Sequence, residues 1–350
     1  MLPRFNNISI SYSTLREHFQ SSSLSTTHSQ YDMWNLCVYL SFLLFVGIIE
    51  ANEDIRQIAS FPGFAENIAI RSNADILVTS LTSPSIRSMN SKKPEGLSIL
   101  PPIPGANGIS GIAEVQHEVF AIAAGIWNIT ARRGTNASVW TVNFQNTPDT
   151  EPALKKIVDI PETTALNGLA AIPGGRIVLG ADSALGAIYA IDTKTRKYSI
   201  AIQDSSLAPK GPAPALGVNG IKIRGSYLYF TNSGTGLFGR IPISRTGKAT
   251  GPVQTISQFF GSTFSAIDDF DLDEHGNAWV SFHSYTIFKV DSQGNQQVAV
   301  NMSDMSLDPT SVALGRGSPK ERSTLYASTN ILGDTITGVI AAVNLSSLPL

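Results

Sequence analysis

Short runs of β-branched and aromatic residues, separated by glycine-containing turns, recur from about residue 66 to the end of the chain. The clearest copies are residues 167–182, 219–232 and 268–281, and each joins two short strands across a turn. The copies begin near six residues: Glu66, Ile109, Asn167, Asn219, Asp268 and Thr310. Intervals of about 42 to 58 residues are typical of four-stranded blades. The pattern therefore predicts an all-β protein, a six-bladed β-propeller with four-stranded blades.

One blade cannot bury both faces of its sheet, so the blades must stack into one cooperative ring, which we assign to residues 52–350. Residues 54–60 precede the first blade and alternate in polarity. We expect this segment to supply the outer strand of the last blade and so to close the ring at an otherwise open edge. Its truncation should destabilise the whole ring.

The N-terminal region has a different character. Residues 34–49 are apolar and are followed by a polar stretch from Glu50, which resembles the hydrophobic core of a signal peptide cleaved near Ala51. We therefore predict a signal peptide over residues 33–51, entry into the secretory pathway and an extracellular protein; an uncleaved anchor is the alternative. Residues 1–32 are rich in Ser and Thr and are predicted to be a disordered extension, unless Met33 is the true start.

Composition limits the partners. The formal net charge of -2 gives no electrostatic reason to expect nucleic acid or, after signal cleavage, a membrane surface. We expect a small organic substrate, and the oligomeric state stays open. The single cysteine, Cys37, lies in the proposed signal peptide, so the mature chain would have no disulfide and no thiolate metal site. The sequence contains no phosphate-binding or dinucleotide-binding motif, so we expect no nucleotide cofactor.

Four Asn-x-Ser/Thr triplets follow the signal peptide and are candidate glycosylation sites if the chain is secreted. They lie at Asn128, Asn136, Asn301 and Asn344.

Polar residues stand at the starts of the predicted innermost strands, which converge on one mouth of the channel. Glu66, Asn167, Asn219 and Asp268 offer two carboxylates and two amide oxygens, the ligands that Ca²⁺ and other hard divalent cations prefer. The alternative is architectural, because Asn-Gly and Asp are also ordinary turn residues. The metal hypothesis depends on the four residues acting together.

The second strand of each blade returns to the same face, so its last residues should surround the pocket one step outward. Trp127, Asp182 and Asn232 are predicted pocket residues on this ground. His283 lies at the mouth and is a candidate proton donor, although a structural histidine is the simpler interpretation. Asp182 is equally typical of a turn.

The phrases at residues 219–233 and 268–280 resemble the family of senescence marker protein, gluconolactonase and regucalcin, over about residues 55–345. The resemblance implies that Glu66, Asn167, Asn219 and Asp268 bind a divalent cation and that Asp268 also acts as a base or water activator. Asp269 is the neighbouring alternative. Thr164-Ala165-Leu166 stands where gluconolactonases place an arginine for a polyhydroxy substrate.

The sequence at residues 66–71, 181–186, 228–233 and 268–273 more closely resembles a secreted fungal branch of these propellers. That branch includes hetero-Diels-Alderases of tropolone-sesquiterpenoid biosynthesis, which join a tropolone o-quinone methide to a humulene-type olefin. The resemblance implies a cyclase that works by holding two reactants in a reactive pose. A Ca²⁺-dependent lactonase or esterase, and a non-enzymatic ligand-binding propeller, are the alternatives.

Overall fold

The computed structural model describes residues 54–91, 93–260 and 266–348, without the side chains of residues 93–95. The predicted N-terminal extension, the predicted signal peptide and Cys37 lie outside these residues. Within the described ranges, no helix combines the length and apolar character needed to cross a membrane.

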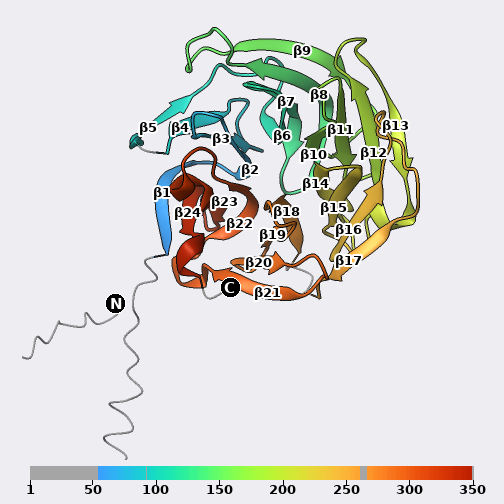
Figure 1. Cartoon of the computed structure of the whole chain (residues 1–350). Coiled ribbons are helices and arrows are strands. Elements are labelled where there is room, and N and C mark those ends of the chain that lie inside the picture. The colour runs from blue at the N-terminus through green and yellow to red at the C-terminus, as the bar shows by residue number, and fades with distance from the viewer. Residues whose placement is uncertain (1–53, 92, 261–265, 349–350) are drawn as a thin grey trace, which may run out of the picture. The chain divides into compact units, whose positions relative to one another are not determined.

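The described strands form six antiparallel sheets of four strands each, arranged around a central axis (Figure 1). This confirms the predicted six-bladed β-propeller. The innermost strands are β2 (Ala65–Ile70), β6 (Gly108–Gln116), β10 (Leu166–Ala171), β14 (Val218–Arg224), β18 (Ile267–Leu272) and β22 (Asp308–Leu314). The second strands are β3 (Asp75–Ser80), β7 (Val119–Asn128), β11 (Ile177–Asp182), β15 (Tyr227–Asn232), β19 (Ala278–Phe282) and β23 (Thr324–Ile331).

The third strands are β4 (Arg87–Asn90), β8 (Arg133–Asn143), β12 (Ala187–Asp192), β16 (Leu237–Pro242), β20 (Thr286–Val290) and β24 (Thr337–Asn344). The outer strands are β5 (Lys93–Ile99), β9 (Ala153–Asp159), β13 (Lys197–Gln203), β17 (Gln254–Gln258), β21 (Gln296–Asn301) and β1 (Ile55–Pro62). Short helical turns lie between strands or after the last one: η1 (Ser205–Leu207), η2 (Ser303–Met305), α2 (Pro319–Arg322) and, after β24, η3 (Leu345–Ser347).

The hydrophobic core is divided among the blade interfaces. Each innermost strand contacts the innermost strands of both neighbouring blades, and the last of them, β22, contacts β2 of the first blade. The six buried apolar clusters each join two neighbouring blades. Because every blade needs neighbours on both faces to bury its side chains, the ring stabilises itself as one unit.

Strand position explains the sequence pattern. The second strands have packed sheets on both sides, so β3 and β11 are almost entirely buried. The outer strand β13 is mostly exposed, and polar residues take up three of its exposed positions: Lys197, Ser199 and Gln203.

Strand β1, from the N-terminal end of the described chain, pairs antiparallel with β24 and is the outer strand of the sheet formed by β22, β23 and β24 (Figure 1). It runs two residues beyond the predicted end at Ser60. The side chain of Phe61 is buried in the cluster between the last and first blades, and Arg87 of the first blade stacks on its ring at 4.0 Å.

Candidate active site at the mouth of the propeller

A β-bulge near the start of each innermost strand positions the predicted site residues. The pairing registers shift between Ala65 and Ile68 in β2, and at equivalent places in β10, β14 and β18. Glu66, Asn167, Asn219 and Asp268 are therefore each the second residue of an innermost strand, inside the irregular step. Asn167 and Asn219 thus lie within strands and not in turns, and whether they bind a cation stays a prediction. Bulges change the direction of side chains, and here they do so at the same position in four of the innermost strands.

Glycines follow the bulge asparagines because another backbone passes close by. A Cβ on Gly168 would lie 2.4 Å from the Asn219 carbonyl oxygen of the next blade, and one on Gly220 would lie 2.7 Å from the Cα of Asp269. Buried hydroxyls strengthen the same junctions: Thr231 donates to the Asp268 carbonyl at 2.6 Å. The Asn-Gly pairs are thus features of blade packing.

The four residues are buried, with 3% to 7% of their surface exposed. The Oδ1 atoms of Asn167 and Asn219 accept no hydrogen bond from any described residue. Burial raises the pKa of Glu66 well above its usual range, and the charge of Asp268 adds to the rise. Unpaired amide oxygens and poorly compensated carboxylates are the donors that a hard divalent cation satisfies, so this set fits Ca²⁺.

His283 follows β19 and lies between two carboxylates. Its Nε2 is 3.2 Å from Asp268 Oδ2, and its Nδ1 is 2.9 Å from Asp308 Oδ2. Burial alone would lower the pKa of the imidazole, but the hydrogen bonds and charges of Asp268 and Asp308 outweigh it and raise the pKa to about 10. The side chain is 27% exposed, so a protonated imidazole is accessible from the mouth.

Asp308, the first residue of β22, is a site residue that sequence reasoning missed. Its Oδ1 accepts from the backbone N–H of Ser284 at 3.0 Å, while its other oxygen contacts His283. Burial would raise the pKa of Asp308, but the hydrogen bond and charge of His283 and these backbone donors lower it. The available signal was an Asp at the start of the sixth blade, two residues before the predicted start at Thr310.

The structure separates the two neighbouring aspartates. Both carboxylate oxygens of Asp269 lie 2.7 Å from Lys222 Nζ, and Ser311 Oγ donates to Oδ2 at 3.0 Å. Asp269 is therefore neutralised by its own lysine, whereas Asp268 is the carboxylate that contacts His283. Asp268 is the better candidate for the site.

The predicted pocket residues have structural contacts. Asp182 Oδ1 accepts from the N–H groups of Ala184 and Leu185, and Asn232 Oδ1 accepts from Gly234 and Thr235. These bonds hold the turns after β11 and β15 at the mouth face. Trp127 is partly exposed at the end of β7. Their role in binding a ligand stays a prediction.

The four candidate glycosylation residues, Asn128, Asn136, Asn301 and Asn344, are all exposed. Modification at these sites stays a prediction.

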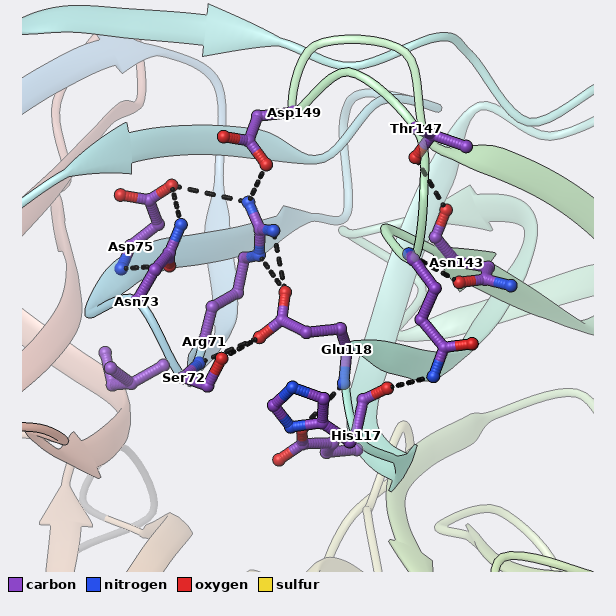
Figure 2. A network of polar contacts seen from close by, with 12 residues as sticks. Arg71, Ser72, Asn73, Asp75, His117, Glu118, Asn143, Thr147 and Asp149 are labelled. Carbon is purple, nitrogen blue, oxygen red and sulfur yellow. Dashed lines mark hydrogen bonds and ion pairs between the residues drawn. The ribbon is translucent and has the colours of Figure 1, made fainter.

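A second cluster of possible metal ligands lies at the turn between β6 and β7, toward the opposite end of the blades. Ligand atoms of Glu114, His117 and Glu118 lie within 4.8 Å of one another. However, Glu118 is bound by Arg71, with 2.6 Å between Oε2 and Nη2 (Figure 2), and Glu114 Oε2 lies 2.6 Å from Arg316 Nη1. Because arginines already neutralise both carboxylates, the mouth remains the better cation site.

Comparison with known proteins agrees with the predicted resemblance. No family model matches the chain. A Phoma protein named as a candidate hetero-Diels-Alderase is 26% identical over 301 residues, which cover 77% of this chain and 84% of that protein. A Sarocladium schorii protein with the same kind of name is 26% identical over 250 residues, covering 63% of this chain and 61% of its own length.

Several solved structures share the fold. A luciferin-regenerating enzyme superposes with a TM-score of 0.61 at 14% identity, covering 84% of this chain and 96% of that one. The calcium-binding protein regucalcin from Agrobacterium tumefaciens has a TM-score of 0.58 at 15% identity, covering 83% and 94%. A gluconolactonase from Xanthomonas campestris has a TM-score of 0.56 at 12% identity, covering 84% and 89%. The chain thus shares the six-bladed propeller fold of these structures, and its sequence is similar to proteins named hetero-Diels-Alderase.

Proposed function

We propose that the protein is a small-molecule enzyme of fungal secondary metabolism, a hetero-Diels-Alder type cyclase that joins a quinone methide to an olefin. The observation that carries this proposal is the similarity to the Phoma protein, which extends over most of both chains. The mouth supplies suitable chemistry, because a buried polar set and an accessible histidine lie together there.

His283 is the residue we assign to the chemical step. In the cycloaddition, the diene of the quinone methide and the double bond of the olefin form one C–O and one C–C bond, and no atom is lost. For this, the Nε2–H of His283 moves from Asp268 Oδ2 to the quinone methide oxygen, where its hydrogen bond stabilises the negative charge that develops. The same group can protonate the hydroxyl that leaves as water when the quinone methide forms from its alcohol.

Asp268 and Asp308 position this imidazole. Each accepts a hydrogen bond from a different ring nitrogen, so the ring is held in one orientation and in its protonated form. The N–H groups of Ser284 and Tyr285 fix the Asp308 carboxylate in turn.

Glu66, Asn167, Asn219 and Asp268 are the residues we propose to hold a divalent cation, with Ca²⁺ as the best fit. A bound cation would supply fixed positive charge next to the substrate and would compensate the buried carboxylates. The protein's own contribution is the rigid placement of these oxygens by four bulged strands.

A Ca²⁺-dependent lactonase is the second candidate, favoured by the same four oxygen donors. In that reaction Asp268 would activate water against a lactone carbonyl. The residues before Asn167 lack the arginine expected for a sugar lactone. A non-enzymatic binding propeller is the third candidate and predicts no turnover at all.

The test is product analysis by mass spectrometry. The purified protein is incubated with a tropolone quinone-methide precursor and a humulene-type olefin, and separately with a panel of lactones, each with and without chelator. The cyclase proposal predicts faster, stereoselective adduct formation and intact lactones. Lactone hydrolysis that chelator abolishes, without any adduct, would replace it with the hydrolase, and the absence of both products would favour the binding protein.

His283→Gln tests the assignment of the proton donor in the same assay. We expect adduct formation to slow by about 10²-fold or more, the usual range for loss of a general acid. The matched control is His275→Gln, because His275 is 77% exposed in the turn between β18 and β19. An unchanged rate in His283→Gln would remove His283 from the mechanism.

A further inference from the structure

A separate cavity of about 580 Å³ opens beside the polar mouth, between the segment at residues 210–216 and the strands of the fifth blade. Its volume lies within the range of about 300–1,000 Å³ that is typical of small-molecule sites. Ile267, Phe259 and Phe282 are apolar residues of its wall.

The cavity shares its wall with the candidate active site. Ile267 directly precedes Asp268, and Phe282 directly precedes His283, and these two wall residues pair across β18 and β19. Ser233, also in the lining, accepts a hydrogen bond from Asn219 Nδ2 at 3.0 Å and donates to the Ile267 carbonyl at 2.8 Å. A ligand in this cavity is therefore one residue away from the groups assigned to catalysis.

Aromatic rings form one side of the cavity. Phe259 and Phe282 stack with their ring centroids 6.0 Å apart and an interplanar angle of 29°. Phe260, the next residue along, is 89% exposed. A large aromatic side chain exposed at the edge of an aromatic wall offers contact area to a flat apolar ligand.

The charges in the cavity have one sign. Arg132 and Lys210 line it and are exposed, and neither side chain has an ion pair or hydrogen bond with another described residue. No Asp or Glu is among the described residues that line the cavity. The neighbouring mouth instead contains acidic side chains, those of Glu66, Asp268 and Asp308. This separation of charge favours an anionic ligand in the side cavity.

We propose that this side cavity binds a flat organic anion, a carboxylate or an acidic enol or phenol with an apolar ring body. The rings of Phe259, Phe260 and Phe282 receive the body, and Arg132 and Lys210 attract the acidic group. That this ligand is the enzyme's substrate rests on the proposed function; that the cavity binds such an anion does not.

The test is isothermal titration calorimetry with two probes of the same shape, 2-naphthoate and neutral 2-naphthalenemethanol. We expect naphthoate to bind more tightly, and Lys210→Gln and Arg132→Gln each to weaken naphthoate by about two- to fivefold, as expected for exposed charge pairs. Neither variant should change the affinity for the alcohol. Phe260→Ala should weaken both probes.

The matched controls are Lys194→Gln and Arg196→Gln, exposed cations in the turn between β12 and β13. Arg196 has a positive φ of 59°, as Arg132 does at 49°, so the backbone contexts are comparable. Equal affinity for the two probes, or an equal loss in the control variants, would overturn the proposal. Asp268→Asn should bind naphthoate normally, so a failure of the catalytic assignment is distinguishable from a failure of this one.

Discussion

Arg71 is the most heavily paired charged residue in the described chain outside the mouth. Its side chain is 4% exposed and contacts Asp75, Glu118 and Asp149, from three different segments (Figure 2). The guanidinium also lies 3.9 Å from the centroid of the Phe144 ring. One cation thus connects the turns of the first and second blades.

Arg71→Met tests how much this network contributes to the free energy of unfolding. The substitution leaves buried carboxylates without a cation, so we expect the free energy of unfolding to fall by about 3–5 kcal/mol, measured by chemical denaturation. Arg176→Met is the matched control, because Arg176 pairs with Asp192 on the surface and is 64% exposed. Equal effects of the two substitutions would contradict the account.

Glu118 makes the same network sensitive to acid. Burial would raise its pKa, but hydrogen bonds from Ser72 and Arg71 outweigh burial and lower the pKa of Glu118 below its usual value. A carboxyl with a lowered folded pKa contributes stability that is present above its unfolded pKa, near 4.3, and is lost as the pH falls through the folded pKa. We therefore expect Glu118→Gln to be less stable than the natural chain at neutral pH and to lose less stability on acidification below about pH 4.3. Parallel stability curves for the two proteins would contradict this.

Part of the candidate site was predictable from residue types and their positions in the repeat. Asp268 and His283 were recognisable because each stands at a strand end that a propeller brings to the mouth. Asp308 was not, because its contact with His283 joins two blades and depends on the closed ring. The structure was also needed to choose between Asp268 and Asp269 as the site residue, because it shows Lys222 paired with Asp269 and His283 in contact with Asp268.

At the scale of the strand, the β-bulge is the feature that positions the candidate site residues at the mouth. The blade starts were predictable from repeat spacing, because hydrophobic runs and turns recur with the blade. The bulges were not, since an Asn-Gly pair is compatible with both a turn and a strand irregularity. The close approach of the backbone of the next blade decides between a turn and a bulge, and that approach exists only in the folded ring.

Gly168→Ala tests the close approach at the bulge. The new Cβ would meet the Asn219 carbonyl oxygen at 2.4 Å, so we expect a loss of about 1–3 kcal/mol of unfolding free energy from overpacking. The control is Gly96→Ala in β5, where a Cβ meets nothing within 4 Å. A Gly168 variant as stable as the Gly96 variant would show that the junction is not tightly packed.

At the scale of the whole molecule, β1 connects the N-terminal end of the propeller to its last blade. A chain that begins at residue 64 lacks this strand and exposes the edge of β24 and the Phe61 site. We expect its thermal unfolding to shift to lower temperature as one transition, because each blade is stabilised by both neighbours. A chain that begins at residue 54 is the control. An unchanged melting temperature would show that the ring does not need the strand.

The most direct test of the central claim is calorimetric titration of Ca²⁺ into the purified, chelator-treated protein. The account predicts one binding site, with affinity reduced about tenfold or more in Glu66→Gln and in Asp268→Asn, while their melting temperatures in excess chelator match that of the natural chain. Glu114→Gln, in the arginine-paired cluster toward the opposite end of the blades, should leave Ca²⁺ affinity unchanged. Absence of Ca²⁺ binding by the folded natural chain, or undiminished affinity in both mouth variants, would contradict the claim that the four bulged strands build a cation site.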